Sequence, residues 1–172
     1  VCDPRGFYSI TKRTAEQLII SFCEVNEVNY RIMRLANVSG QDKTVSSQKN
    51  VLGFLVTLMR DNKELTLYNN GEDLRDYMHV TDVCRAIKTV MDKGEVNTIY
   101  NIARGFPLPF RIILEIIREW INSESKFTSV EIPRFNRLSQ PKNFSLNTDK
   151  LKSLGFKPEI SIDDIVEELC IN

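Results

Sequence analysis

A helical run of apolar residues with a short apolar segment directly behind it is the feature that most limits how this chain can fold. Apolar residues recur at helical spacing between residues 15 and 23, which predicts a helix with one apolar face. Asn26 and Glu27 interrupt that pattern, and residues 28–35 then read as a strand. A short, mostly apolar strand directly after a helix is typical of a parallel sheet that is buried on both faces. The sequence therefore predicts two elements of an α/β fold at its start.

Tyr8 and Lys12 lie at the beginning of the predicted helix, within the sequence Gly-Phe-Tyr-Ser-Ile-Thr-Lys. Residues four apart in a helix lie one turn above each other on the same side, so the two side chains can act as a pair. An ammonium group one turn away favours the phenolate form of a phenol, and such a pair suits proton transfer. If a hydride carrier binds beside them, the two side chains would form an alcohol oxidation site. The alternative is an ordinary solvated helix face, on which Tyr and Lys at this spacing usually have no chemical role.

The composition fits one ordinary globular domain, or part of one. The chain has 172 residues, of which 42% are hydrophobic, enough for a core of its own. Lys plus Arg and Asp plus Glu both total 23, and no basic block is interleaved with aromatic residues. We therefore expect neither nucleic acid nor a membrane as a partner. No apolar run approaches the roughly 20 residues that cross a bilayer, and no charged-then-apolar leader stands at the start.

The cysteines indicate a reducing environment. All four are far apart in the sequence, none forms a Cys-x-x-Cys pair, and His79 is the only histidine. This pattern argues against a zinc or other metal site and against a disulfide framework. The simplest location for such a chain is the cytoplasm.

Further elements are predicted along the rest of the chain. Residues 41–49 are polar and read as a loop that orders only on ligand. Asn50 then opens a helical pattern, either as its cap or as a ligand contact at its N-terminus. Periodicity and turn residues predict a strand at 65–68, a turn at 69–73, an extended piece at 77–80, a helix at 83–91 capped by Thr81 and ended by Gly94, a strand at 98–103, a helix at 112–121, a strand with connecting loops at 123–143, a short helix at 148–154 and a last helix opened by Ser161 with Asp164.

Three polar side chains occupy positions where ligands are often bound. Asn37 lies in residues 36–41, a predicted loop past the carboxyl end of a strand, and either donates to a ligand oxygen or is a turn asparagine. Arg75 could clamp a diphosphate with its planar fork, or form a salt bridge to Asp76 or a neighbour, and the residues favour neither reading. His79 stands alone in an extended segment, which is typical of a structural histidine.

Taken in order, these motifs resemble the extended short-chain dehydrogenase/reductase family, in particular its NAD-dependent nucleotide-sugar epimerases and 4,6-dehydratases. Residues 8–12 are similar to the family's Tyr-x-x-x-Lys, and residues 34–41 to its Arg-x-x-Asn-Val-Tyr-Gly-Pro. Residues 68–82 resemble Tyr-Gly-x-Gly-x-x-x-Arg-Asp-Tyr-x-x-Val-x-Asp, and residues 100–102 and 154–158 match later landmarks. The resemblance covers essentially the whole chain.

The resemblance implies an α/β fold, the C-terminal part of a Rossmann-type doubly wound parallel sheet plus a small α/β substrate-binding domain. Residues 1–40 would be the last part of the dinucleotide-binding Rossmann domain, with the Tyr-x-x-x-Lys helix and the following strand. Residues 41–172 would be mainly the sugar-nucleotide-binding domain, with segments around 76–103 returning to the Rossmann sheet.

The resemblance also implies roles for individual residues. Tyr8 would be the catalytic base that takes the sugar hydroxyl proton while hydride goes to the nicotinamide of NAD, or of NADP. Lys12 would bind the nicotinamide ribose and favour ionised Tyr8, and Leu35 would lie near the nicotinamide. The nucleotide-diphosphate sugar would be held by Asn37, Asn50, Val51, Thr66, Tyr68, Arg75 on the diphosphate, Asn101, and Lys142 from a late loop.

Departures from the family pattern limit what the resemblance implies for these 172 residues. The family begins with a glycine-rich turn that cradles the cofactor pyrophosphate, and no Gly-x-x-Gly-x-x-Gly unit is present. We therefore expect the chain from Val1 to be the C-terminal part of a longer protein, to bind NAD weakly and not to turn over alone. In the full-length protein we expect a homodimer through the helix that carries Tyr8. Ser39, Gln41 and Asn69 replace the usual Tyr, Pro and Gly.

Several functions remain open at this point. The leading hypothesis is an NAD(P)-dependent nucleotide-sugar epimerase or dehydratase that transfers hydride at sugar C4. The alternatives are a 4-keto-sugar-nucleotide reductase, which residues 140–151 resemble more closely, and a non-catalytic sugar-nucleotide-binding relative. The nucleotide base, the sugar and the choice of NAD or NADP stay open as well.

Overall fold

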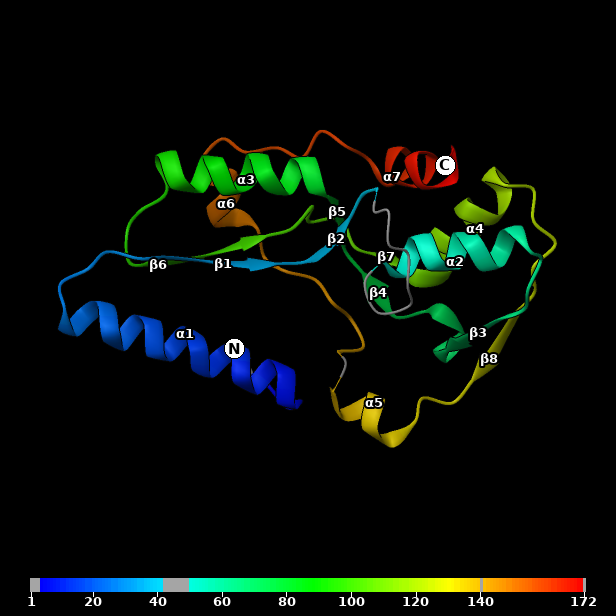
Figure 1. The fold of residues 1–172 in the computed structure, drawn as a ribbon, viewed down its shortest axis with the longest axis horizontal. Coiled ribbons are helices and arrows are strands. Elements are labelled where there is room, and N and C mark those ends of the chain that lie inside the picture. The colour runs from blue at the N-terminus through cyan, green and yellow to red at the C-terminus, as the bar shows by residue number, and fades with distance from the viewer. Residues whose placement is uncertain (1–3, 42–49, 140, 172) are drawn as a thin grey trace.

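The computed structural model describes residues 4–41, 50–139 and 141–171. Its elements in chain order are α1 (Phe7–Val25), β1 (Arg31–Leu35), β2 (Asn37–Ser39), α2 (Val51–Arg60), β3 (Leu65–Tyr68), the 3-10 turn η1 (Asn69–Gly71), β4 (Leu74–Arg75), β5 (Tyr77–His79), α3 (Val80–Lys93), β6 (Thr98–Ile102), β7 (Leu108–Pro109), α4 (Phe110–Trp120), β8 (Phe127–Val130), α5 (Arg134–Ser139), α6 (Asp149–Ser153) and α7 (Ile162–Ile171). Figure 1 shows an elongated molecule with two groups of elements along its length.

The strands pair two by two, mostly in parallel. β1 pairs with β6, β2 with β5 and β3 with β8, all in parallel, whereas β4 pairs with β7 in antiparallel orientation. The register sets Met33 beside Tyr100 and Arg34 beside Asn101. Parallel pairing between strands that lie far apart in the sequence requires crossover connections, and helices α2 and α3 are part of these. The predicted parallel α/β fold is thereby confirmed.

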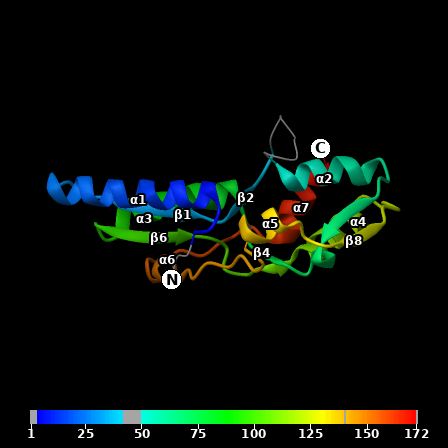
Figure 2. The ribbon, with the colours of Figure 1, turned by 90° about the horizontal axis from the view of Figure 1, so that it is seen from below.

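Helices cover both faces of the β1–β6 pair. α1 lies on one side of it, and α3 and α6 lie on the other (Figures 1 and 2). Because side chains alternate along a strand, Met33 joins Tyr100 and Ile102 in the core under α3, while Arg34 reaches Glu16 of α1. This is the doubly covered arrangement that buried parallel strands require.

The hydrophobic core consists of two clusters that meet at β5. One cluster is built by α2, β3, α4 and α7, and the other by α3, β6 and α6. Tyr77 belongs to the first cluster and its neighbour Met78 to the second. Successive side chains of a strand point to opposite faces, so this three-residue strand forms a wall that both clusters share.

The apolar face predicted for the first helix does not pack on the rest of the described chain. The helix itself is confirmed, but Leu18, Ile19 and Phe22 are exposed, and Cys23 is the only residue of α1 that is buried. The side of α1 that faces β1 instead carries Glu16, whose carboxylate pairs with Arg34. This ion pair therefore contributes to the contact between the helix and the strand.

Three local predictions were wrong. Residues 36–41, predicted as a loop, contain strand β2, whose three residues pair with distant β5 and show no periodicity of their own. The helix at 83–91 begins earlier and is capped by His79, not Thr81, because the His79 ring accepts from the Thr81 amide at 3.2 Å. Helix α5 lies where loops were predicted, in residues 123–143. The predicted loop over residues 42–49 lies outside the described residues.

The other predicted elements are confirmed, with boundaries that shift by a few residues. Asn50 caps α2 by accepting from Gly53 N at 3.0 Å. Ser161 and Asp164 form the reciprocal pair predicted for the last helix, because Asp164 N donates to Ser161 Oγ and Ser161 N donates to Asp164 Oδ2.

Candidate functional site

Tyr8 and Lys12 lie one turn apart at the start of α1, as their spacing predicts. Lys12 Nζ is 5.6 Å from the centre of the Tyr8 ring, and Tyr8 is 76% exposed. α1 runs antiparallel to β1, so its first turn lies on the side of the molecule where β1 ends (Figure 1). Open α/β sheets bind their ligands outside the carboxyl ends of their strands. The pair is therefore on the side where a ligand is expected.

An ion pair holds α1 on β1. Arg34 Nε is 2.7 Å from Glu16 Oε1 and its terminal nitrogen is 2.6 Å from Glu16 Oε2, so the contact is bidentate. Arg13 adds a further contact to the same carboxylate at 2.9 Å. The hydrogen bonds from Arg34 lower the pKa of Glu16, although partial burial opposes them. Glu16 follows Lys12 by one turn, so this contact fixes the helix next to the Tyr8–Lys12 pair.

A cavity of about 310 Å³ lies just beyond the end of β1. It is lined by Ala36, Asn37, Val38, Ser39, Asn50, Val51, Leu52 and Tyr77. Three of the residues predicted to hold the nucleotide sugar, Asn37, Asn50 and Val51, therefore share one cavity. They come from β2 and from the first turn of α2, which lie on either side of residues 42–49 in the sequence.

Hydrogen bonds fix both asparagines of this cavity. Asn37 Nδ2 donates to the Asp76 carbonyl at 3.1 Å. Asn50 Nδ2 donates to the Gly40 carbonyl at 3.2 Å, while its Oδ1 caps α2. A side chain at Gly40 would force Val80 to shift, because an added Cβ would lie 2.7 Å from Val80 Cγ1. Asn50 thus caps α2 and also holds the segment that contains Gly40. Both contacts fix its side chain at the cavity.

Asp76 is fully buried next to the cavity strands. Its Oδ2 accepts from the backbone amide of Gly105 at 2.8 Å, which ties β5 to the turn after β6. Burial raises the pKa of Asp76, and the Gly105 amide and the positive charge of Arg104 offset part of that effect. Gly105 has φ +80°, a conformation that other residues rarely adopt. The Asp76 carboxylate is thus engaged with a loop and not with Arg75.

Arg75 forms an ion pair with its neighbour Asp73 and also donates hydrogen bonds to two backbone carbonyls. Its guanidinium donates to the carbonyls of Leu74 at 2.7 Å and Lys142 at 2.9 Å. The nearest carboxylate oxygen belongs to Asp73, at 3.7 Å. The structure therefore brings Arg75 and Lys142 together, as the predicted diphosphate site requires, but through the main chain of Lys142.

The remaining predicted residues lie outside the cavity. Leu35 ends β1 and is 45% exposed. Thr66 and Tyr68 are on β3, in the part of the molecule farthest from α1 (Figure 1). Asn101 is on β6 and donates to the Asn147 carbonyl at 2.9 Å.

A contact from the last helix was not predicted from the sequence. Glu168 of α7 accepts from the Gln41 amide at 2.8 Å, and its other oxygen is 2.9 Å from His79 Nε2. His79 Nδ1 accepts from Thr81 N, so the ring connects α7 to the start of α3. The structural role predicted for His79 is confirmed. Its partner could not be found from spacing, because 89 positions separate the two residues.

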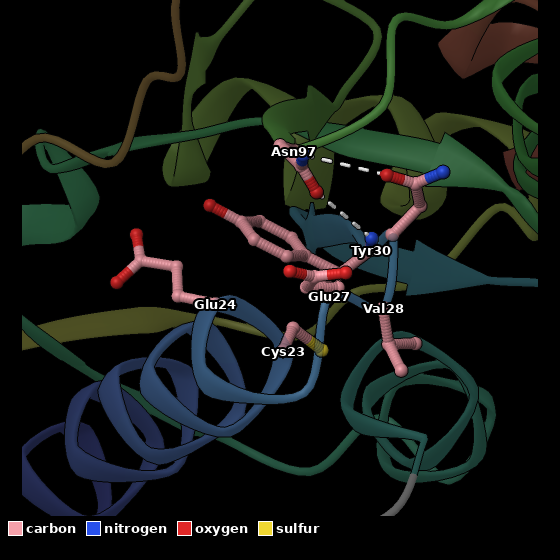
Figure 3. Close-up of a pocket in the computed structure, with 7 residues that line it drawn as sticks. Cys23, Glu24, Glu27, Val28, Tyr30 and Asn97 are labelled. Atoms are coloured by element: carbon pink, nitrogen blue, oxygen red, sulfur yellow. Dashed lines mark hydrogen bonds between the residues drawn. The ribbon is translucent and has the colours of Figure 1, made fainter.

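A second cavity, of about 300 Å³, lies at the opposite end of α1 (Figure 3). It is lined by Cys23, Glu24, Glu27, Val28, Asn29, Tyr30 and Asn97. Asn97 bridges its rim, accepting from the Tyr30 amide and donating to Asn29 Oδ1. This cavity is at the amino end of β1, away from the edge where α/β sheets bind ligands. None of the predicted site residues lines it.

Within residues 4–41, 50–139 and 141–171, no helix is long and apolar enough to cross a bilayer. The same residues contain no group of three or more His, Cys, Asp or Glu side chains arranged to hold a metal ion. Cys23, Cys84 and Cys170 are free thiols.

Parallel strands covered by helices on both faces, with a polar cavity beyond the end of β1, define a Rossmann-type α/β protein. The chain belongs to the NAD dependent epimerase/dehydratase family, whose family model matches residues 1–103.

The chain is also similar in sequence or fold to individual proteins that are consistent with this family. The chain is 28% identical over 165 residues to a low-salt glycan biosynthesis protein of Haloferax volcanii, covering 95% of this chain and 51% of that protein. It is 26% identical over 170 residues to the mouse dTDP-D-glucose 4,6-dehydratase, covering 96% of this chain and 47% of the enzyme. A UDP-glucose 4-epimerase of Thermotoga maritima, solved with UDP-glucose, superposes with a TM-score of 0.83 at 24% identity, over 95% of this chain and 52% of that one. The chain thus spans about half the length of the relatives it matches.

Proposed function

We propose that this chain supplies the catalytic tyrosine and the sugar-nucleotide pocket of an NAD-dependent nucleotide-sugar epimerase or dehydratase. The observation that carries the proposal is the cavity beyond β1, which brings Asn37, Asn50 and Val51 together in a member of this family. Two of the similar proteins are named for the diphosphate sugars dTDP-glucose and UDP-glucose. A nucleoside-diphosphate sugar is therefore the class of ligand that we propose for this cavity.

Tyr8 would act as the base toward the sugar C4 hydroxyl. The ammonium of Lys12, 5.6 Å from the centre of the Tyr8 ring, can donate to a ribose hydroxyl. NAD, when bound, supplies a hydride acceptor. Leu35 offers an exposed apolar side chain at the end of β1, which fits the flat face of a nicotinamide. These three residues suit the nicotinamide end of the cofactor.

The cavity would orient the substrate. The amides of Asn37 and Asn50 are held in place by backbone partners, so they need no reordering when a ligand binds. Arg75 would take the diphosphate by exchanging carbonyl partners for phosphate oxygens, which are stronger acceptors of charge-assisted hydrogen bonds.

We further propose that α1 forms a homodimer contact. Phe7, Leu18, Phe22 and Val25 expose an apolar stripe along one side of the helix. Exposed stripes of this kind are typical of association surfaces. Sedimentation equilibrium should give a dimer for the chain and a monomer for the Leu18→Glu, Phe22→Glu variant. A monomeric parent chain would contradict the dimer and leave the pocket assignment intact.

The pocket is tested by titrating the ¹⁵N-labelled chain with UDP-glucose and with dTDP-glucose. Amide signals of Asn37, Ser39, Asn50 and Val51 should shift, and those of Glu24, Glu27 and Asn97 at the second cavity should not. The Tyr8→Phe variant should bind equally, because its missing hydroxyl serves proton transfer. Shifts confined to the second cavity, or no shifts at millimolar ligand, would overturn the pocket assignment.

The catalytic assignment is tested in the protein that naturally contains this chain. Tyr8→Phe should lower turnover by at least about 100-fold with little change in substrate affinity, because general base catalysis contributes roughly that much. Unchanged turnover would refute the role of Tyr8 and favour a binding protein.

A further inference from the structure

The peptide group between Gly40 and Gln41 is held from both sides. Its carbonyl oxygen, on Gly40, accepts from Asn50 Nδ2 at 3.2 Å. Its amide, on Gln41, donates to Glu168 Oε1 at 2.8 Å. A peptide group is planar, so its carbonyl and its amide cannot turn independently of each other. The side chain that caps α2 and a side chain of α7 therefore fix the same rigid unit.

The carboxylate of Glu168 is itself held by a buried imidazole. Its second oxygen is 2.9 Å from His79 Nε2, and the His79 side chain is 8% exposed. Because His79 Nδ1 accepts from the Thr81 amide, the ring proton belongs on Nε2, which donates to Glu168. Gly40 packs close to the same ring, since a Cβ added to it would lie 3.6 Å from His79 Nε2. The two oxygens of Glu168 thus serve two different donors.

Helix α7 also supports the cavity beyond β1 through the hydrophobic core. Its buried apolar residues belong to the same core cluster as Leu52 and Tyr77, which line the cavity. Asn50 lines the cavity too, and the 40–41 peptide group connects it with Glu168. The apolar face of α7 and its Glu168 side chain therefore act on the same cavity by separate routes.

We propose that Glu168 is a positioning residue of this cavity. It fixes the orientation of the 40–41 peptide group, and through the Gly40 carbonyl it keeps the Asn50 amide in the orientation that binds the ligand. The inference rests on the proposed function and goes beyond it, because it gives the last helix a part in binding although Glu168 does not line the cavity.

The test changes one carboxylate of α7 at a time. Glu168→Ala removes both acceptor oxygens, and Glu168→Gln leaves one acceptor oxygen for the two donors. Glu167→Ala removes the neighbouring exposed carboxylate and is the matched control for the change in charge. Two quantities are measured on the ¹⁵N-labelled chain. They are the side-chain amide signals of Asn50 without ligand and the dissociation constant for UDP-glucose.

Loss of the carboxylate should affect both quantities. Without ligand, the Asn50 side-chain signals should shift in Glu168→Ala and stay in place in Glu167→Ala. Glu168→Ala should weaken UDP-glucose binding about three- to fivefold, because affinity falls with the fraction of molecules that hold Asn50 in the binding orientation. Glu168→Gln should give an intermediate loss, and Glu167→Ala should bind like the parent chain.

A double variant separates positioning from a general loss of stability. If Glu168 acts through Asn50, adding Glu168→Ala to Asn50→Ala should cause no further loss of UDP-glucose affinity. A loss of stability that is unrelated to Asn50 would add to the effect of Asn50→Ala, or would lower the melting temperature without changing the affinity.

Three results would overturn the inference alone. They are unchanged Asn50 side-chain signals in Glu168→Ala, equal UDP-glucose affinity for Glu168→Ala and the parent chain, and additive effects of the two substitutions. If the parent chain does not bind UDP-glucose at millimolar concentration, the proposed function fails. The ligand-free signals of Asn50 would then still decide whether Glu168 positions this side chain.

Discussion

The Tyr8–Lys12 pair and the cavity beyond β1 are built in opposite ways. The pair stands on the open surface of α1, and the helix is seated on β1 by the Glu16–Arg34 ion pair. The cavity is walled by short elements, and its asparagines are fixed by hydrogen bonds and backed by buried apolar residues such as Leu52. The groups proposed to bind are therefore already in place within this chain. The groups proposed to react depend on how α1 is held.

Replacing one leucine in each region with alanine should give the largest difference in unfolding free energy between the two regions. Leu52→Ala, at 1% exposure beside the cavity, should cost about 2–5 kcal/mol of unfolding free energy because it leaves a hole in the core. Leu18→Ala, at 66% exposure on α1, should change it by no more than about 0.5 kcal/mol in the monomer. Urea unfolding of dilute samples measures both. Equal losses would mean that α1 is as tightly packed as the cavity wall.

High pH should destabilise the cavity side through Tyr77. Burial raises its pKa from 10.0 to about 12, although the positive charge of Arg75 opposes that rise. Below pH about 10 the phenol is neutral in both states, but between about 10 and about 12 only the unfolded protein ionises, so stability falls as pH rises. The loss should approach about 2–3 kcal/mol, measured by urea unfolding across this range. Tyr77→Phe should remove that part of the pH dependence, and an unaltered profile would contradict the assignment.

A smaller effect is expected at the cap of α2. Asn50→Ala should cost about 1 kcal/mol, because the Gly53 amide loses its acceptor. Asn50→Asp keeps that acceptor but loses the donor to the Gly40 carbonyl, so most of the stability should return. The amide signals of Gly40 and Gln41 should shift in both variants. If they shift in neither, Asn50 does not hold this segment.

Loss of the Glu16–Arg34 contact should have the smallest effect on stability. The effect should be confined to α1. The pKa of Glu16 is lowered in the folded state, so its contribution is present above the usual carboxyl range and is lost as pH falls through the lowered pKa. Arg34→Met should therefore speed hydrogen exchange of α1 amides at neutral pH, while those of α2 keep their protection. The parent chain at low pH should behave like the variant at neutral pH. Faster exchange in both helices would mean that the contact supports the whole fold.

Local signals in the sequence were sufficient for the long elements. Helices α2, α4 and α7 and strands β1, β3 and β6 have clear periodicity or end signals, such as Asn50 and the Ser161–Asp164 pair, and all were predicted. The three-residue strand β2 was missed because its only support is pairing with β5, 40 positions away. Thr81 was chosen as a cap on residue preference, whereas the structure uses the ring of His79.

The candidate site was predictable only in part for the same reason. Asn37 and Asn50 follow a strand and open a helix, positions that a single sequence reveals. Tyr77 and Leu52 complete the cavity through packing, and Glu168 reaches Gln41 from the last helix, so no spacing rule connects them. Ser39 was visible as a departure from the family pattern, but its enclosed hydroxyl required the fold.

The shared wall at β5 also restricts how such a protein can be recombined. The chain passes repeatedly between the two hydrophobic clusters, and Tyr77 and Met78, adjacent in sequence, serve one cluster each. No single crossover point can therefore exchange the cavity for that of another family member while leaving the β1–β6 pair and its core intact. An exchanged segment that carries the cavity would have to include β5, and its β5 would also have to fit the core beneath α3. New ligand specificities should therefore arise more readily by point substitution of cavity-lining residues than by exchange of segments.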